Sequence, residues 1–188
     1  MPLNKPKVVI AKGGIHGHCW FAGEDIKEGE WIWKRRDPGA PHTDVFLTWA
    51  EIQAMPQQTR DDFMALAYQV DDTHYCGFDP NKPKLQEELE EDWVNHSCDG
   101  NAWYENDDLL VAMRYIKKGE EICYDYCLTE ANPDWKLADG NRCLCGTALC
   151  RGSVSGNDWK LPHLRAKYGR HFLAYVLKRI DELEQRPS

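Results

Sequence analysis

Short apolar runs separated by polar or glycine-rich turns recur along most of the chain. The first of them, Val8-Val9-Ile10, is followed by the glycine-studded segment 13–17. Runs of this length that are rich in β-branched and aromatic residues and bounded by turn formers predict strands. Six segments have this pattern: 8–10, 20–22, 31–33, 68–76, 109–113 and 121–126. The pattern predicts a mainly β protein built from short strands.

A helical insert is predicted between the third and fourth of these strands. Thr48 and Thr59 each lie three residues before an acidic residue, an arrangement that resembles the capping box at the start of a helix. Pro56 lies between them and interrupts helical structure. Two short helices are therefore expected in an insert at about 48–68.

A stripe of apolar residues at helical spacing follows residue 160. Its members recur every three or four positions: Leu164, Tyr168, Phe172, Val176, Ile180 and Leu183. Gly169, a weak helix former, interrupts the stripe. A C-terminal helix, or a pair of helices, is therefore expected at 160–188, packed back onto the domain through this stripe.

The composition is that of one globular domain of moderate size. The 188 residues are 42% hydrophobic, and eight Trp, eight Tyr and five Phe are far more aromatic residues than a disordered chain carries. With 23 Lys and Arg against 31 Asp and Glu, the net charge is −8. This acidic balance argues against sequence-independent binding to nucleic acid and favours a basic partner or none.

The hydropathy of the chain also bears on its location. No stretch reaches the roughly 18 to 20 consecutive apolar residues that a membrane-spanning helix needs, so no membrane association is expected. The first residues, Met1-Pro2-Leu3-Asn4-Lys5-Pro6-Lys7, lack the apolar core of a signal peptide. An intracellular location, nuclear or cytoplasmic, is therefore expected.

The eight cysteines are unevenly spaced, and Cys143, Cys145 and Cys150 lie within eight residues. Inside a cell this clustering indicates a metal site, because a reducing compartment disfavours disulfides. The competing interpretation, a secreted disulfide scaffold, conflicts with the missing signal peptide and with a chain long enough to bury a core. A structural zinc site takes four thiolates, and Cys98, in the polar segment 94–101, is the best fourth donor. The remaining cysteines are expected to be free and unmetallated: Cys19, Cys76, Cys123 and Cys127.

Two tyrosines, Tyr124 and Tyr126, alternate with a polar residue in the last predicted strand. Side chains two residues apart on a strand share a face, so both phenols are expected to face one pocket. For an isolated pair the plainer interpretation is two structural tyrosines with hydrogen-bonded hydroxyls. The sequence motifs around this pair favour the interpretation that both tyrosines line a functional pocket.

Four sequence motifs in a fixed order are more informative than any of them alone. They are Gly17-His18-Cys19-Trp20-Phe21-Ala22 followed by Ile26-Lys27-Glu28-Gly29-Glu30, then Asn95-His96-Ser97-Cys98, then Gly119-Glu120-Glu121-Ile122-Cys123-Tyr124-Asp125-Tyr126, and finally Cys143-Leu144-Cys145 through Cys150-Arg151-Gly152. In order and spacing they resemble the SET-domain protein lysine methyltransferases that carry a post-SET zinc motif. The resemblance covers about residues 8–159.

The resemblance implies a fold and a division of the chain. The SET-domain fold is α+β, mainly β with helical insertions, and consists of several small sheets. Its Asn95 segment is threaded through a loop in a knot-like arrangement that general topology rules do not predict. The expected parts are a SET domain at 7–127 that contains the insert, a post-SET zinc segment at 128–159 and a C-terminal helical extension at 160–188.

The resemblance also implies a cofactor site. Asn95 and His96 correspond to the family's residue pair that contacts S-adenosylmethionine, and Trp159 is expected to cover the adenine. The glycine-rich first motif corresponds to backbone contacts with the cofactor, made by Gly17, His18, Cys19 and Trp20.

A catalytic pair and a metal site are implied in the same way. Tyr126 corresponds to the family's catalytic tyrosine, and Tyr124 corresponds to a position where the family has Phe or Tyr and where that choice limits the number of methyl groups added. One structural zinc ion per chain is expected, bound by four thiolates: Cys98, Cys143, Cys145 and Cys150.

Two positions depart from the family pattern. Cys19 stands where the first motif usually has Gly, so a side chain is expected where the backbone approaches the cofactor. Gly100 stands where Pro usually precedes the last Asn of the second motif, which loosens a turn without removing a functional atom. Neither change implies a loss of activity.

The implied activity is transfer of methyl groups from S-adenosylmethionine to a lysine side-chain amine of a protein, ending at mono- or dimethyl-lysine. This reaction needs a neutral amine aligned with the methyl donor in a narrow apolar channel that excludes water. A histone tail is the leading substrate, because an acidic enzyme attracts a basic peptide, and a non-histone protein is the alternative.

Two other classes of function are weighed against the enzyme. One is a catalytically silent SET-like module that binds a basic peptide or a protein partner, and the other is a zinc-stabilised interaction domain unrelated to methyl transfer. The presence of Asn95, His96 and Tyr126 together favours the enzyme over the silent module. Binding of S-adenosylmethionine distinguishes the enzyme from the interaction domain.

Overall fold

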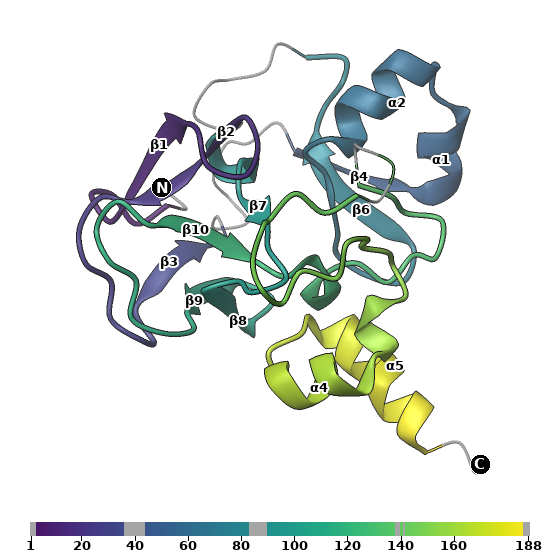
Figure 1. Cartoon of the computed structure of the whole chain (residues 1–188). Helices are drawn as coiled ribbons and strands as arrows, with labels where there is room; N and C mark the ends of the chain where they lie inside the picture. The colour runs from purple at the N-terminus through teal and green to yellow at the C-terminus, as the bar shows by residue number, and fades with distance from the viewer. Residues whose placement is uncertain (1–2, 36–43, 83–89, 138–139, 141, 186–188) are drawn as a thin grey trace.

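The described strands form three small sheets, and helical regions flank them (Figure 1). The computed structural model describes residues 3–35, 44–82, 90–137, 140 and 142–185, and the elements given below are those of these residues. Strands of two to five residues precede and follow the two helices of the insert, and further helical segments follow the last strand. The predicted α+β class, mainly β with helical insertions, is confirmed.

The four-stranded sheet joins segments that are far apart in the sequence. Its order is β1 (Val8–Lys12), β2 (His18–Ala22), β10 (Glu121–Tyr124) and β7 (Asn95–His96). The pairing of β10 with β7 is parallel and sets Tyr124 opposite His96. The second and third sequence motifs therefore lie side by side, while the knot-like threading of the Asn95 segment stays a prediction.

Two three-stranded antiparallel sheets complete the strands. One has the order β3 (Trp31–Lys34), β9 (Leu109–Ala112) and β8 (Ala102–Asn106), and the other β4 (Asp44–Thr48), β6 (His74–Phe78) and β5 (Tyr68–Gln69). The predicted strand at 68–76 is thus two strands joined by a turn. In this turn the Asp71 carboxylate accepts hydrogen bonds from the backbone N–H of Thr73 (2.7 Å) and His74 (2.8 Å).

The insert contains two short helices, as predicted, but only the first starts with a capping box. At α1 (Trp49–Ala54) the Thr48 hydroxyl accepts the Glu51 N–H at 3.2 Å, and the Glu51 carboxylate accepts the Thr48 N–H at 2.7 Å. The predicted capping box at Thr59 is wrong, because α2 (Gln57–Met64) already begins after Pro56. A proline lacks an N–H and therefore loses no hydrogen bond at a helix start.

The C-terminal stripe forms a pair of helices, α4 (Pro162–Tyr168) and α5 (Ala174–Glu184). Gly169 separates them with a φ of +56°, in the left-handed region that favours glycine. Five of the predicted stripe residues are buried: Leu164, Tyr168, Phe172, Val176 and Ile180. None of the described helices is long and apolar enough to span a membrane.

Two apolar cores support the sheets. The larger one lies among the four-stranded sheet, the β3–β9–β8 sheet and the C-terminal helices. The smaller one lies beneath the insert and contains Cys98, Trp135 and Cys143. Tyr126 packs against both cores. Tyr126 therefore lies where the two cores meet.

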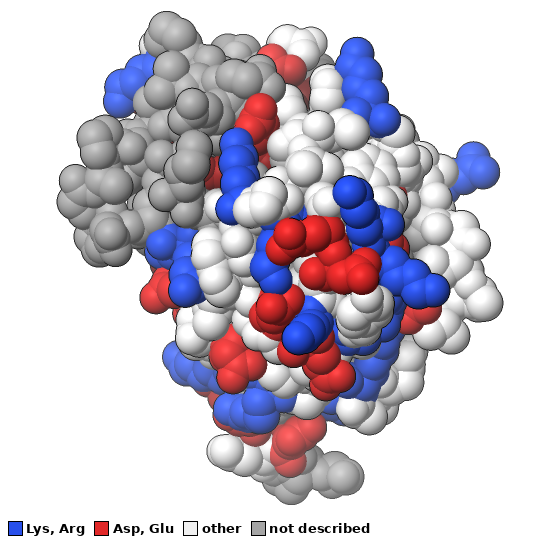
Figure 2. Space-filling view, turned by 90° about the vertical axis from the view of Figure 1, so that its left-hand side faces the viewer, with Lys and Arg blue, Asp and Glu red and all other residues white. Residues whose placement is uncertain are grey.

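One face of the molecule, over the turns that join β2 to β3 and β9 to β10, mixes acidic and basic side chains (Figure 2). Ion pairs connect several of them: Lys7 Nζ lies 2.6 Å from a Glu30 oxygen, and Arg114 lies 2.5 Å from a Glu120 oxygen. Charges of opposite sign neutralise each other here. Acidic and basic side chains are therefore interspersed on the described part of this face.

Candidate active site

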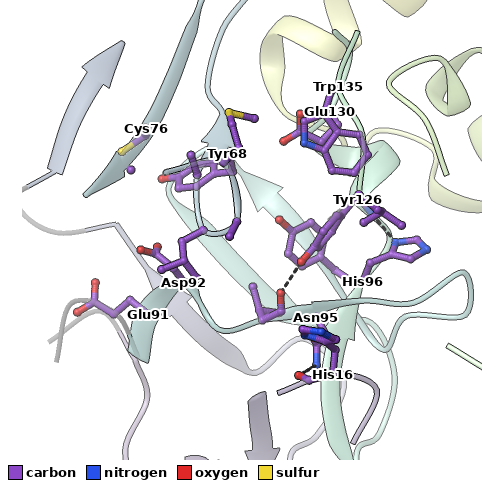
Figure 3. Close-up of a pocket in the computed structure, with 18 of the residues that line it drawn as sticks. His16, Tyr68, Cys76, Glu91, Asp92, Asn95, His96, Tyr126, Glu130 and Trp135 are labelled. Atoms are coloured by element: carbon purple, nitrogen blue, oxygen red, sulfur yellow. Dashed lines mark hydrogen bonds between the residues drawn. The ribbon is translucent and has the colours of Figure 1, made fainter. Parts of the chain in front are cut away.

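A cavity of about 240 Å³ lies between the four-stranded sheet, the end of α2 and the segment around Trp135. Figure 3 shows His16 and Asn95 on one side of it, Tyr68 and Trp135 on the opposite side, and Tyr126 between them. The cavity thus extends from the glycine-rich loop to the helical insert.

Tyr124 and Tyr126 both line this cavity, but they do not share a strand. The prediction of a strand over 121–126 is wrong at its end: β10 stops at Tyr124, and Tyr126 begins the 3-10 helix η1 (Tyr126–Leu128). The Asp125 carboxylate caps this helix by accepting the Cys127 N–H at 3.1 Å. The ring centroids of the two tyrosines are nevertheless 5.1 Å apart, so the two rings meet as the sequence suggested.

The phenols of the cavity remain protonated at neutral pH. Burial raises the pKa of Tyr124 and Tyr126 well above the usual value, as it does for the neighbouring Tyr104. The Tyr126 hydroxyl donates to the Val94 carbonyl oxygen at 2.7 Å, which fixes its direction. These hydroxyl groups can act as dipoles and hydrogen-bond partners, but not as phenolate bases.

Asn95 fastens the glycine-rich loop to the sheet. Its side-chain amide donates to the His16 carbonyl oxygen at 3.0 Å and to the Glu121 carboxylate at 2.8 Å. The second Glu121 oxygen accepts the Ile15 N–H at 2.9 Å. Gly14, with a φ of +69°, allows the loop to pass over this carboxylate, since a Cβ atom there would lie 2.3 Å from Glu121 Oε2.

The residues of the first motif have different surroundings. Trp20 lines the cavity, whereas His18 stacks on Trp93 with the ring centroids 4.6 Å apart. Cys19 is fully buried, and its thiol donates to the Gly13 carbonyl oxygen at 3.0 Å. Its side chain therefore packs beneath the loop. Gly17, His18 and Cys19 do not line the cavity, and their backbone contacts with a cofactor stay a prediction.

His96 is a neutral residue between Tyr126 and the cysteine cluster. Its Nδ1 accepts the Tyr126 backbone N–H at 3.1 Å, which assigns the ring proton to Nε2, 3.4 Å from Cys98 Sγ. Burial lowers the pKa of His96 to about 4, although the nearby Asp125 raises it. The 3.7 Å contact between His96 and Asp125 is therefore not an ion pair at neutral pH.

The predicted metal-binding cysteines lie together. The sulfur atoms of Cys98, Cys143, Cys145 and Cys150 are all within 4.8 Å of one another, and those of Cys98 and Cys143 are 3.7 Å apart. A zinc ion with four thiolates at 2.3 Å requires sulfur atoms about 3.8 Å apart. All eight cysteines are free, so the structure contains no disulfide scaffold.

Backbone amides support negative charge on these sulfur atoms. The N–H groups of Cys145, Arg151 and Gly152 donate to sulfurs of the cluster at 3.5, 3.3 and 3.4 Å. Burial opposes ionisation of Cys145, but hydrogen bonds from Thr147 lower its pKa. The donor set thus fits a metal that binds thiolates. The other cysteines are buried and lie outside the cluster: Cys19, Cys76, Cys123 and Cys127.

A buried ion pair joins the cysteine cluster to the turn that carries Tyr126. Asp125 accepts two hydrogen bonds from the Arg151 guanidinium, at 2.6 and 2.8 Å. Burial opposes its ionisation, but the hydrogen bonds and the charge of Arg151 hold the pKa of Asp125 below its usual range. Because the Arg151 backbone also bonds to Cys98, the cluster and Tyr126 are fixed relative to each other.

Two further sequence features have structural explanations. A Cβ atom at Gly100 would lie 2.8 Å from the Cα atom of Tyr124, so the glycine allows β10 to pass closely. Trp159 is 5% exposed and packs with the C-terminal helices, and its Nε1 donates to the Gly156 carbonyl oxygen at 3.1 Å. It does not line the cavity, and its role over the adenine stays a prediction.

Glu130 and Arg151 are functional candidates that the sequence did not predict. Arg151 directly follows the last cysteine of the fourth motif, which was a usable signal. Glu130 follows Tyr126 by four residues, and the Glu130 N–H donates to the Tyr126 carbonyl oxygen at 2.8 Å. This helical turn brings Glu130 to the cavity. Because a strand was predicted at 121–126, the turn and the position of Glu130 were not expected.

Glu130 has a pH-dependent effect on stability that a variant can reveal. Burial raises its pKa from 4.5 to about 8, so the folded protein holds this proton more tightly than the unfolded chain. The resulting stabilisation is full below the unfolded pKa and is lost as the pH rises through the folded pKa. Glu130→Gln cannot ionise and is expected to have a Tm at about pH 9 higher than wild type by roughly 3 °C or more. Thermal unfolding at about pH 5 and about pH 9 measures this, with the exposed Glu28→Gln as control. An equal pH dependence in Glu130→Gln and wild type would contradict it.

The SET-domain model matches residues 17–127, more than half of the chain. Small sheets, a helical insert and a cavity between Asn95 and Tyr126 accompany this match. The chain therefore belongs to the SET-domain family, as the four motifs predicted.

Several histone-lysine N-methyltransferases are similar to parts of the chain. The enzyme ash1 of Drosophila melanogaster is 34% identical over 119 residues, which are 55% of this chain and 5% of that protein. The H3 lysine-9 specific enzyme dim-5 of Neurospora crassa is 36% identical over 77 residues, 32% of this chain and 23% of that protein. The H3 lysine-4 specific enzyme of Cryptococcus neoformans is 26% identical over 160 residues, 80% of this chain and 10% of that protein. The chain thus spans less than a quarter of each of these relatives.

Proposed function

We propose that the protein transfers methyl groups from S-adenosylmethionine to the side-chain amine of a lysine in a protein substrate. The observation that carries the proposal is a single cavity lined by Asn95 and His96 and also by Tyr124 and Tyr126. The resemblance to the family implies that Asn95 and His96 bind the cofactor and that Tyr124 and Tyr126 act in methyl transfer. Family membership and the similarity to histone-lysine N-methyltransferases support the same activity.

The polar groups near Asn95 fit the methyl donor. Both N–H bonds of the Asn95 amide are used within the protein, and none of the described residues donates to its oxygen. This oxygen is suited to accept a hydrogen bond from the amino group of S-adenosylmethionine. When bound, the cofactor supplies an electrophilic methyl group on a sulfonium. The backbone of Gly17, His18, Cys19 and Trp20, the His96 segment and Trp159 complete the proposed cofactor contacts.

The tyrosines suit the transfer step. Tyr124 and Tyr126 present aromatic surface that excludes water from the reacting amine. The Tyr126 hydroxyl, directed by its bond to Val94, is placed to orient the amine and to stabilise the positive methyl group during transfer. Because its pKa is raised, it acts as a neutral dipole.

A structural zinc ion is part of the proposal. The thiolates of Cys98, Cys143, Cys145 and Cys150 would hold it, and the sulfur geometry and the N–H donors given above support this. The ion would fix the segment 143–152 to Tyr126 through Arg151 and would take no part in methyl transfer. We divide the chain accordingly into a SET domain at 7–127, a post-SET segment at 128–159 and a helical extension at 160–188.

A basic segment such as a histone tail is the proposed substrate. Four acidic residues line the cavity, namely Asp44, Glu91, Asp92 and Glu130, and the net charge of the chain is −8. A negative field attracts a peptide rich in Lys and Arg. The relatives named above are histone-lysine N-methyltransferases, which supports the same choice.

Two measurements test the proposed function. Calorimetry with S-adenosylmethionine on the purified protein is expected to show binding, and a peptide array incubated with labelled cofactor is expected to show methylated lysine. Cofactor binding with no methylation of any peptide or protein would indicate the silent module instead. If neither cofactor binding nor methylation is observed, the result would favour the zinc-stabilised interaction domain.

Replacing Tyr124 with Phe is expected to raise the number of methyl groups added per lysine. Tyr124 is 4% exposed, and its ring is packed between those of Tyr104 and Tyr126. A hydroxyl there can hold the amine directly or through a water, so each further methyl group loses roughly 1 to 3 kcal/mol of transition-state stabilisation. The wild-type protein should therefore stop at mono- or dimethyl-lysine, and Tyr124→Phe should reach trimethyl-lysine with little loss of total activity.

Mass spectrometry of a methylated peptide measures the product distribution. Tyr115→Phe removes a hydroxyl that binds Asp25 outside the cavity, and it serves as the matched control. Efficient trimethylation by wild type, or the same products from Tyr124→Phe, would show that another channel residue sets the limit.

A further inference from the structure

Glu130 is a buried acid without a cationic partner among the described residues. It is 2% exposed, and its oxygens accept hydrogen bonds from the Gln69 N–H at 3.1 Å and the Tyr75 hydroxyl at 3.4 Å. A carboxylate offers about four acceptor positions, so these bonds use only part of its capacity. Buried carboxylates are normally paired with a cation. The hydrogen bonds from Gln69 and Tyr75 therefore leave acceptor positions on Glu130 for a further donor.

The Glu130 side chain belongs to the wall of the active-site cavity. It lines the cavity together with Tyr124 and Tyr126, and Figure 3 shows it beside Trp135 and above Tyr126. The other acidic residues of the described lining are less buried and interact with neighbouring groups: Asp44, Glu91 and Asp92. Glu130 is therefore the buried carboxyl group available to a cation that enters the cavity.

The position of Glu130 is fixed from two sides. On one side Gln69 donates its N–H to Glu130, and the Gln69 side-chain oxygen accepts the Ala131 N–H at 3.0 Å. On the other side the Glu130 backbone continues the turn that starts at Tyr126. A carboxyl group held in this way does not have to reorganise when a substrate arrives.

We propose that Glu130 is a catalytic base that accepts the proton of the substrate's lysine ammonium group inside the channel. The inference rests on the proposed function, because the expected cation is the lysine itself. Lysine enters from water mostly protonated, and only the neutral amine has the electron pair that attacks the methyl group.

Proton transfer to Glu130 precedes methyl transfer. An N–H bond of the ammonium breaks, its electron pair stays on nitrogen, and an O–H bond forms on Glu130. The nitrogen electron pair then forms the bond to the methyl carbon while the carbon–sulfur bond breaks, and its electrons remain on the sulfur as a neutral thioether. The product is a methylated ammonium, and Glu130 returns its proton to water before the next methyl transfer.

The groups that face Glu130 do not compete for this role. They are tyrosines from five elements, all with a pKa raised by burial: Tyr75 of β6, Tyr104 of β8, Tyr124 of β10, Tyr126 of η1 and Tyr175 of α5. Arg179 of α5 donates to the Ala131 carbonyl oxygen at 2.6 Å and is paired with Asp72. Burial raises the pKa of Glu130 to about 8, so the carboxyl group is mostly protonated at pH 7 and becomes available as a base as the pH rises toward 8 and above.

The test is the pH profile of kcat/KM for Glu130→Gln on the best peptide from the array. The variant keeps the shape of the side chain and an acceptor for the Gln69 N–H, but it cannot take a proton. Its activity then depends on amine that has lost its proton to solvent, so the deficit should be on the order of 100-fold at about pH 8 and shrink to about threefold at about pH 10. Affinity for S-adenosylmethionine should not change.

Three outcomes decide the proposal. A pH-independent loss of activity in folded Glu130→Gln, or no loss, would overturn it, and Glu28→Gln controls for a general effect of removing one acidic group. If Glu130→Gln does not fold, wild type is assayed with a peptide carrying aminoethylcysteine, whose amine has a lower pKa than lysine. The acidic limb should then stay near pH 8, whereas a limb that moves with the amine would overturn the proposal. Absence of methylation by wild type at every pH would instead refute the proposed function.

Discussion

Replacing Tyr126 with Phe is expected to lower the rate of methyl transfer by at least on the order of 100-fold while affinity for S-adenosylmethionine stays nearly intact. The ring would remain packed against Tyr124 and His96, so the cavity keeps its shape. Only the hydroxyl that the Val94 carbonyl directs is lost. Since this group acts chiefly in the transition state, the loss should appear in kcat and hardly in cofactor binding.

Single-turnover kinetics with a methylated-peptide readout, together with calorimetry for the cofactor, would measure both effects. Tyr115→Phe, outside the cavity, should leave both unchanged. Asn95→Ala should show the opposite pattern and weaken cofactor binding, because it also releases the loop held through His16 and Glu121. Near-normal turnover in Tyr126→Phe would mean that Tyr126 is not the catalytic tyrosine.

Removing zinc is expected to unfold the cysteine-rich segment and abolish activity. Metal binding becomes folding free energy for a segment with so little apolar core of its own. The loss spreads to the active site, because Arg151 bonds to Cys98 through its backbone and to Asp125 through its side chain. Cys145→Ser should lower the zinc content from one ion per chain toward none and lower Tm by about 10 °C or more.

Elemental analysis of natively purified protein, before and after a chelator, measures the zinc content. Cys123→Ser is the matched control, since Cys123 is a buried free cysteine that lies outside both the cluster and the cavity lining. Active protein without zinc, or full activity in Cys145→Ser, would defeat the zinc proposal.

The strands and the first helix of the insert could be predicted because their signals are local. An apolar run between turn formers, as at Val8, and the reciprocal hydrogen bonds of Thr48 and Glu51 need only neighbouring residues. The second helix start was mispredicted, because Pro56 provides a start that involves no side-chain cap. Which strands pair could not be predicted, since the pairing of β7 with β10 joins residues 28 positions apart without a local signal.

Five of the residues expected in the site line the cavity, namely Trp20, Asn95, His96, Tyr124 and Tyr126, but the geometry of the site could not be predicted. Tyr126 leaves the strand because Asp125 caps a helical turn and is itself held by Arg151, a contact across 26 positions. The same turn brings Glu130 to the cavity. The grouping of the four cysteines, by contrast, could be predicted. Three of them are close in sequence, and a tetrahedral metal site needs a fourth thiolate, for which Cys98 was the best donor.

The most direct test of the central claim is the mass of a lysine-containing basic peptide after incubation with the zinc-loaded protein and S-adenosylmethionine. Wild type is expected to add one or two methyl groups to a single lysine, and Tyr126→Phe, folded and able to bind the cofactor, is expected to add almost none. An unmodified peptide set and unmodified histones with the wild-type protein, despite bound cofactor and zinc, would contradict the assignment of methyl transfer to this cavity.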